Sequence, residues 1–303
     1  RQNIPNAADI DCDGMLDLLM GRLVGTVTRY ETIGGIGTAA PRFRHITDRF
    51  EGIEILGSPD GIRNGIVPTQ QFELLGAGPV PFSGGLPTMR HGANTMVLAD
   101  VDGDGDMDFF WGDFFEPGLL FIENGGSCTE PNLRTEPQQF PLNDPLETSG
   151  YNAPTFGDMD GDGDLDLLIG VLGGAYNPNM TTADNLLHLT QTADDGFQLQ
   201  TRRFISQIDV GSESVPSFVD LDGDGDLDLL LGNRIDPEDS TTSHVLRFEN
   251  VGTPTAPAFQ SAGRIDMDGS YHNAPAFGDL DGDGDLDILL GTWLADLRYI
   301  ENT

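Results

Sequence analysis

The hydrophobic residues of this chain fall in short runs, and clusters of Gly, Pro, Asn and Asp separate one run from the next. Runs bounded in this way are typical of β-strands. No stretch sustains the 3.6-residue apolar spacing of an amphipathic helix, and only residues 60–75 leave room for a short helix. The pattern therefore predicts an all-β protein.

One acidic segment recurs five times, each time directly before an apolar run that ends in glycine. The copies begin at Asp9, Asp100, Asp158, Asp220 and Asp279, at steps of 91, 58, 62 and 59 residues. Three of the four steps are thus close to 60 residues. A fixed period of this kind indicates a repeat architecture.

Each repeat contains four predicted strands, here termed A to D. A Pro-containing run precedes the acidic loop, a Leu-rich run follows it, a third run often ends in Glu-Asn, and a fourth starts at a phenylalanine (Phe43, Phe140, Phe197 and Phe259). Four-stranded units repeated radially are typical of a β-propeller. An open β-solenoid is the alternative, but its repeats are usually shorter.

We therefore expect one β-propeller domain or segment over residues 1–303, with the acidic loop between strands A and B of each blade. The expected repeats span about 1–51, 91–148, 149–210, 211–269 and 270–303, with an insertion at about 52–90 and an incomplete last blade. Whether five blades close into a ring is left open.

The five acidic loops share the pattern D-x-D-x-D-G-x-x-D. Alternate aspartates of a tight loop can point inward together, and Ca²⁺ takes six to eight oxygen ligands in this way. Glycine at the sixth position permits the sharp turn. Carboxylates so close together repel one another without a cation. A solvated acidic turn is the alternative, and its fivefold repetition is difficult to explain without metal.

An EF-hand is the obvious competitor, and it needs a bidentate Glu at the twelfth position. That position is apolar in all five loops, where it holds Met20, Trp111, Ile169, Leu231 and Leu290. The ninth-position aspartate is therefore expected to close the site, and the chain runs directly into strand B.

The loop, the preceding Phe-Gly (Phe156-Gly157 and Phe277-Gly278) and the period resemble FG-GAP/VCBS repeats. Such repeats build the calcium-binding propeller of integrin α subunits and of many bacterial surface or secreted proteins. The resemblance covers nearly the whole chain except residues 52–90. It implies about five Ca²⁺ sites, whose ligands are Asp9, Asp11, Asp13, Asp17, Asp100, Asp102, Asp104, Asp108, Asp158, Asp160, Asp162, Asp166, Asp220, Asp222, Asp224, Asp228, Asp279, Asp281, Asp283 and Asp287.

The antiparallel order places the calcium loops on one face of the propeller and the B–C and D–A connections on the other. These connections differ in length, and surface loops that vary on a regular scaffold often form binding sites. The aromatic residues there suggest a partner-binding surface formed by Trp111, Phe114, Phe115, Tyr151, Tyr176, Tyr271 and Trp293. The alternative is that about half of them pack between blades.

The two cysteines, Cys12 and Cys128, belong to repeats that should be adjacent. A disulfide is possible in an oxidising compartment, and two free thiols are the alternative. The five histidines form no HExxH pair, and no GxSxG is present, so zinc or hydrolase catalysis has no support.

The formal net charge of −35 disfavours nucleic acid and anionic membranes as partners. Twenty-four of the 50 acidic residues lie in the five loops, so much of this charge belongs to the expected metal sites. No apolar run approaches the roughly 20 residues that cross a bilayer.

We expect a non-catalytic, extracytoplasmic (periplasmic, cell-surface or secreted) module for protein interaction, adhesion or structure at the cell envelope. A lectin-like, glycan-binding propeller is the first alternative, and a polysaccharide-active enzyme is the second.

Overall fold

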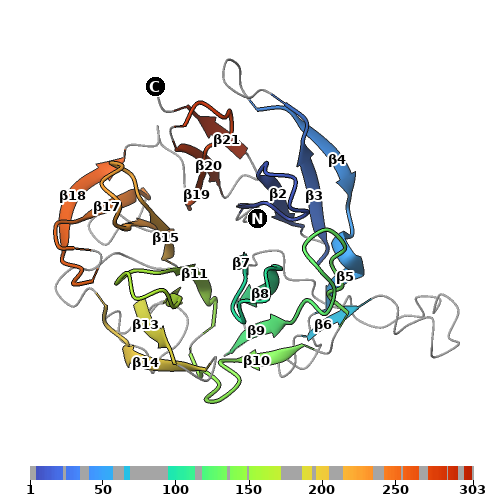
Figure 1. The fold of residues 1–303 in the computed structure, drawn as a ribbon, viewed down its shortest axis with the longest axis horizontal. Helices are drawn as coiled ribbons and strands as arrows, with labels where there is room; N and C mark the ends of the chain where they lie inside the picture. Colours follow the sequence, from blue (N-terminus) through green and yellow to red (C-terminus); the bar gives the residue numbers. More distant parts are fainter. Residues whose placement is uncertain are drawn as a thin grey trace, which may run out of the picture.

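The computed structural model describes residues 5–22, 25–34, 41–56, 65–68, 95–112, 118–134, 137–148, 150–171, 186–192, 196–204, 214–234, 242–253, 255–265, 272–284, 286–292 and 297–301. These residues include five antiparallel sheets arranged around a centre (Figure 1). The strands are β1 (Pro5–Ala8), β2 (Asp17–Gly21), β3 (Val27–Thr32) and β4 (Phe43–Thr47) in the first sheet; β7 (Thr95–Ala99), β8 (Asp108–Gly112), β9 (Leu119–Ile122) and β10 (Gln138–Phe140) in the second; β11 (Ala153–Gly157), β12 (Asp166–Gly170), β13 (Leu186–Gln191) and β14 (Phe197–Thr201) in the third; β15 (Val215–Val219), β16 (Asp228–Gly232), β17 (Val245–Asn250) and β18 (Phe259–Ile265) in the fourth; and β19 (Ala274–Gly278), β20 (Asp287–Gly291) and β21 (Leu297–Ile300) in the fifth.

The sheets are the blades of a β-propeller, and each blade runs in chain order from the inside outward. The innermost strands contact one another in the order β1, β7, β11, β15 and β19, and β19 contacts β1 again. The first and last blades are thus neighbours, and the ring closes with five blades (Figure 1). The all-β fold with a propeller of four-stranded repeats is confirmed, and the fifth sheet has three strands within the described residues.

The core contains one apolar cluster at each junction between neighbouring blades and a sixth, smaller cluster formed by Tyr151, Ala153, Val215 and Ala274. Successive side chains of a strand point to opposite faces, so adjacent residues of strand B pack against different neighbours. In blade 3, for example, Leu167 packs against blade 2, whereas Leu168 packs against blade 4. Both leucines are fully buried. This explains why strand B has a continuous apolar run and not an alternating one.

The segment that follows the first blade lies outside the blade sheets. A single 3₁₀ turn (Phe50–Gly52) leads into β5 (Ile53–Leu56), which pairs with β6 (Gly65–Pro68) in a separate two-stranded sheet. The short helix expected within residues 60–75 is wrong at Gly65–Pro68, which is a strand. Ladder pairing with β5 overrides the weak helical pattern there.

In three blades the pairing between the two outermost strands is irregular. The register shifts once between β3 and β4, once between β13 and β14, and once between β17 and β18. The inner pairs of these blades keep a continuous register. Each irregularity marks a β-bulge, which bends and twists the outer part of its blade.

The glycine that ends strand B lies against the main chain of the next blade. A Cβ added to Gly170 would clash with the carbonyl oxygen of Ser214, and one added to Gly232 would clash with that of Asn273. Gly112 lies against the carbonyl groups of Tyr151 and Asn152 in the same way. The recurring glycine therefore permits close packing of the blades.

We expect Gly170→Ala to lower the free energy of unfolding by about 1–3 kcal/mol or more, because the added methyl group must displace the backbone of blade 4. Denaturant titration measures the change. Gly118→Ala is the matched control, since the nearest atom to a Cβ there is in the Gln139 side chain, at an ordinary contact distance of 3.4 Å. Equal stability of the two variants would contradict this account of the blade junction.

Candidate metal centres

In all five blades the acidic loop joins the innermost strand to strand B, as the sequence predicts. The described residues of these loops lie between β1 and β2, β7 and β8, β11 and β12, β15 and β16, and β19 and β20. All five therefore lie at the same end of their hairpins, on one face of the ring.

The first aspartate of each loop organises the backbone. In blade 2 the backbone N–H of Gly103 donates to Oδ1 of Asp100 at 2.8 Å, and that of Gly105 donates to Oδ2 at 3.0 Å. The same pair of bonds recurs at Asp158 in blade 3 and at Asp220 in blade 4. The first carboxylate thus holds the loop closed around itself.

The third and fifth aspartates each accept a hydrogen bond from the backbone two residues further on. In blade 2 the N–H of Asp104 donates to Asp102 at 3.2 Å, and the N–H of Asp106 donates to Asp104 at 3.0 Å. Blade 4 repeats both bonds. These bonds fix the backbone so that the carboxylates stay on the inner side of the turn.

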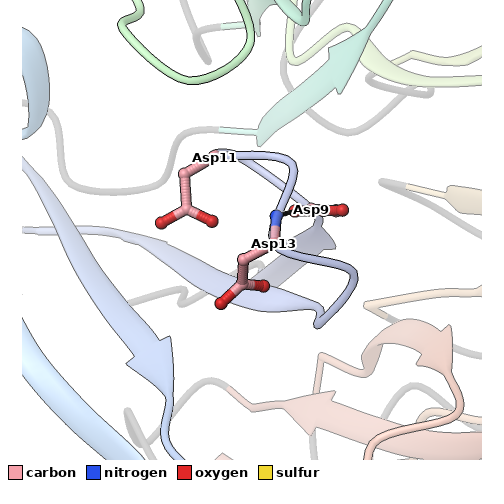
Figure 2. A group of neighbouring side chains, drawn as sticks. All are labelled: Asp9, Asp11 and Asp13. Carbon is pink, nitrogen blue, oxygen red and sulfur yellow. Dashed lines mark hydrogen bonds between the residues drawn. The ribbon is translucent and has the colours of Figure 1, made fainter.

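Carboxylate oxygens converge in every loop. In each blade, three aspartates offer oxygens that lie within 4.8 Å of one another, namely Asp9, Asp11 and Asp13; Asp100, Asp102 and Asp104; Asp158, Asp160 and Asp162; Asp220, Asp222 and Asp224; and Asp279, Asp281 and Asp287. Figure 2 shows the carboxylates of Asp11 and Asp13 on the same side of the first loop, and the hydrogen bond from the Asp13 backbone to Asp9. Clusters of hard oxygen donors at this spacing suit Ca²⁺.

The ninth aspartate is buried and joins the loop to strands B and C. In blade 2 Asp108 accepts hydrogen bonds from the backbone N–H of Asn124 at 2.8 Å and of Val101 at 3.4 Å. Burial raises the pKa of Asp108 to about 7. Within the described residues, the ninth aspartate belongs to the converging group only in blade 5, as Asp287; in the other four blades the group is formed by the first, third and fifth positions.

The seventh position carries acids that the sequence analysis did not treat as side-chain ligands. Asp106 is 4% exposed and Asp226 is 8% exposed, and Oδ1 of each has no hydrogen-bond partner within the described residues. Burial, followed by the repulsion of Asp104, raises the pKa of Asp106 to about 6. A nearby divalent cation would stabilise these charged groups, so the residues present fit calcium. The signal in the sequence is the aspartate at this position in four of the five loops.

Blade 1 differs from the others because an arginine reaches its loop. Nη2 of Arg29, on β3, lies 2.5 Å from Oδ2 of Asp11 and 2.6 Å from Oδ2 of Asp17. Nε of Arg29 also donates to Oδ2 of Asp17 at 3.0 Å. The third and ninth aspartates of this loop are thus bridged by one guanidinium group.

Cys12 and Cys128 form a disulfide with a Cα–Cα distance of 5.8 Å. The sequence left open whether the two cysteines form a disulfide or remain free thiols, and the structure contains the disulfide. Cys12 is the fourth residue of the first loop and has a φ of 57°, a conformation that glycine adopts at this position in the other four loops. Cys128 follows β9 of blade 2, so the disulfide ties the first loop to the neighbouring blade.

The aromatic partner-binding surface needs correction at two positions. Trp111 is fully buried in the junction between blades 1 and 2. Tyr151 is also fully buried, where its hydroxyl group lies 3.1 Å from Nε2 of His272. Alternation along β8 turns Trp111 toward blade 1, whereas Tyr151 precedes β11 with a φ of 76° and packs against Ala153, Val215 and Ala274. The other five residues, Phe114, Phe115, Tyr176, Tyr271 and Trp293, lie outside the described residues.

A central channel of about 200 Å³ runs between the five innermost strands. Its lining includes Asn6, Val97, Thr155, Ser217 and Ala276, one residue from each blade, together with Phe156, Phe218 and Phe277. None of the described residues that line it carries a charge. The channel lining is therefore polar but uncharged, in contrast to the acidic loops.

These features define the class of the molecule as a five-bladed β-propeller with an aspartate-rich loop in every blade. The family described as FG-GAP-like repeat matches residues 100–169 and 220–290. Two stretches of this β-propeller thus match the FG-GAP-like repeat.

Two solved structures are similar to the chain. One is an Agrocybe aegerita lectin that recognises non-reducing terminal N-acetylglucosamine; it is 16% identical, with a TM-score of 0.42 over 95% of this chain and 74% of that chain. The other is the V. cholerae biofilm matrix protein Bap1, which is 14% identical, with a TM-score of 0.31 over 90% of this chain and 40% of that chain. Both scores lie below 0.5, so neither likeness bears on function.

No curated protein sequence matches the chain. Among the described residues, no helix is long and apolar enough to cross a membrane.

Proposed function

We propose that this chain is a non-catalytic, calcium-binding β-propeller that acts outside the cytoplasm as a module for protein interaction, adhesion or structure. The observation that carries the proposal is that three aspartate carboxylates converge at the same hairpin in all five blades. A scaffold that repeats its metal loop in this way uses the cation to hold its shape, which leaves other surfaces to contact a partner.

The first, third and fifth aspartates of a loop would hold the ion; in blade 5 the ninth aspartate, Asp287, converges with the first and third instead. Bound calcium supplies positive charge that offsets the repulsion among these carboxylates. The protein's own contribution is the set of backbone hydrogen bonds that orients the side chains, such as those to Asp100. A loop ordered in advance in this way loses little conformational entropy when the ion binds.

A role without catalysis agrees with the remaining chemistry of the described residues. Most clustered carboxylates belong to the loops, where backbone N–H groups already engage them. The buried histidine His272 lies beside Tyr151, and burial lowers its pKa well below the ordinary value, so it stays neutral. The central channel offers no acid–base pair. These features support a binding or structural role over hydrolysis.

An extracytoplasmic location is supported by the disulfide and agrees with the proposed calcium binding. The disulfide between Cys12 and Cys128 is typical of proteins that mature in an oxidising compartment. Calcium is also plentiful outside the cytoplasm, where sites of weak affinity can remain filled. We propose a protein or a glycan of the cell envelope as the partner, contacted through the B–C and D–A connections.

Isothermal titration calorimetry of the metal-free protein tests the calcium proposal. We expect saturable Ca²⁺ binding at several sites and much weaker binding of Mg²⁺, which prefers octahedral geometry and retains its water. Equal affinity for the two ions, or heats no larger than those of dilution, would overturn the proposal. Cross-linking in the native envelope, followed by mapping of the footprint, tests the partner surface. A footprint confined to the face that carries the metal loops would contradict the proposed placement.

A further inference from the structure

We propose that the first loop does not bind calcium and that the guanidinium group of Arg29 provides the positive charge in its place. The inference rests on the proposed calcium binding at the other loops. It divides the five loops into two kinds, one with an internal cation and four that take a metal ion.

The first argument is the geometry around Arg29. Its side chain is only 13% exposed and contacts Asp11 at 2.5 Å and Asp17 at 2.6 Å, both through Nη2. These are the third and ninth positions, which are two of the four expected ligands. The guanidinium group engages Oδ2 of both aspartates, and Oδ1 of Asp17 accepts the backbone N–H of Thr32 at 3.1 Å. A divalent cation placed beside the guanidinium group would be repelled by it.

The second argument is the comparison with the other blades at the same register. Arg29 pairs with Leu19 of β2, and the equivalent residues of strand C are Phe121, His188, Arg247 and Tyr299. Among the aspartates of its loop, His188 contacts the ninth, at 3.3 Å, and its ring also lies against Phe204. The ion pair of Arg247 is with Glu249 at 3.8 Å. Within the described residues, an ion pair with the third aspartate forms in blade 1 alone.

The third argument is the composition of the first loop. Its seventh residue is Met15, where the other four loops have aspartate, so this loop carries one negative charge fewer. Its fourth residue is Cys12, which is cross-linked to blade 2 through the disulfide. An ion pair and a covalent bond thus stabilise the conformation of the first loop. In the other loops a metal ion would provide this stabilisation.

A matched pair of substitutions tests the inference. Asp13 and Asp104 are both fifth-position residues, and each accepts a hydrogen bond from the backbone two residues further on, at 2.8 and 3.0 Å. Asparagine retains this acceptor and removes the charge. By native mass spectrometry with calcium titration, we expect Asp104→Asn to lose one tightly bound Ca²⁺. Asp13→Asn should keep the ion count of the unmodified protein, and loss of an ion in this variant overturns the inference.

The converse variant, Arg29→Gln, should gain one bound ion, because the carboxylates of Asp11 and Asp17 are released. A variant that stays folded and gains no ion also overturns the inference. Circular dichroism in calcium confirms folding. If Arg29→Gln unfolds, Arg29→Lys is tested in its place. Lysine keeps the positive charge, so this variant should bind as many ions as the unmodified protein. A gained ion in Arg29→Lys would contradict the role of charge. A failure of the proposed function would give a different result, namely an unmodified protein that binds no calcium at loops 2 to 5.

Discussion

Removal of calcium with EGTA is expected to lower the midpoint of thermal unfolding steeply and to expose the chain to proteases. Without the ion, three carboxylates in each loop lie within 4.8 Å of one another and repel, and acids such as Asp106 remain buried. Each occupied site stabilises the folded state by about 2.7 kcal/mol when free calcium is 100 times its dissociation constant. Several sites acting together exceed the effect of any single substitution considered above.

Differential scanning calorimetry and limited proteolysis, each with and without EGTA, measure this change. Sodium chloride at matched ionic strength is the control, because monovalent salt screens the repulsion without filling a site. Restoring calcium should recover the full transition. An unfolding midpoint that EGTA leaves unchanged would show that the loops are acidic turns and not metal sites.

Loss of the disulfide is expected to have the second largest effect. The bond joins residues separated by 116 positions, so it restricts the unfolded chain strongly. Replacing both Cys12 and Cys128 with serine should lower the free energy of unfolding by about 2–4 kcal/mol. The loss should also weaken the junction between the first two blades, where the bond crosses from one to the other.

Denaturant titration in the presence of calcium measures the effect of the disulfide and keeps it apart from that of the metal. A reducing agent should destabilise the unmodified protein to the same extent and leave the double serine variant unchanged. Intact mass after alkylation under denaturing, non-reducing conditions provides a direct check. Two alkylated cysteines in that experiment would show that the bond does not form in solution.

The sequence predicted the propeller because its signal is periodic and local. The acidic pattern locates strands A and B directly, since the loop must lie between them, and the apolar strand B follows from burial on both faces. Closure of the ring could not be predicted in this way. It depends on contact between β1 and β19, which belong to the first and last repeats and are far apart in the sequence.

The aromatic surface shows where reasoning from residue type is insufficient. Trp111 occupies the twelfth position of its repeat, which is apolar in every copy, and this periodicity would have placed it in the core. Arg29 was missed for a different reason. Its approach to Asp11 depends on the register between β2 and β3, which the loop length alone does not determine.

The bulges between the two outermost strands affect how readily the exposed edge of a blade can pair with a strand of another copy of the protein. An outer strand presents unpaired N–H and C=O groups that can act as a template for a strand of another molecule. In blades 1, 3 and 4 the register shift next to this rim bends the outer strand away from a flat ladder, and the interior of β18 is exposed to solvent. A bent rim is a poor template for intermolecular sheet growth. The same irregularities that distort these blades therefore protect a chain rich in β-structure from edge-to-edge aggregation.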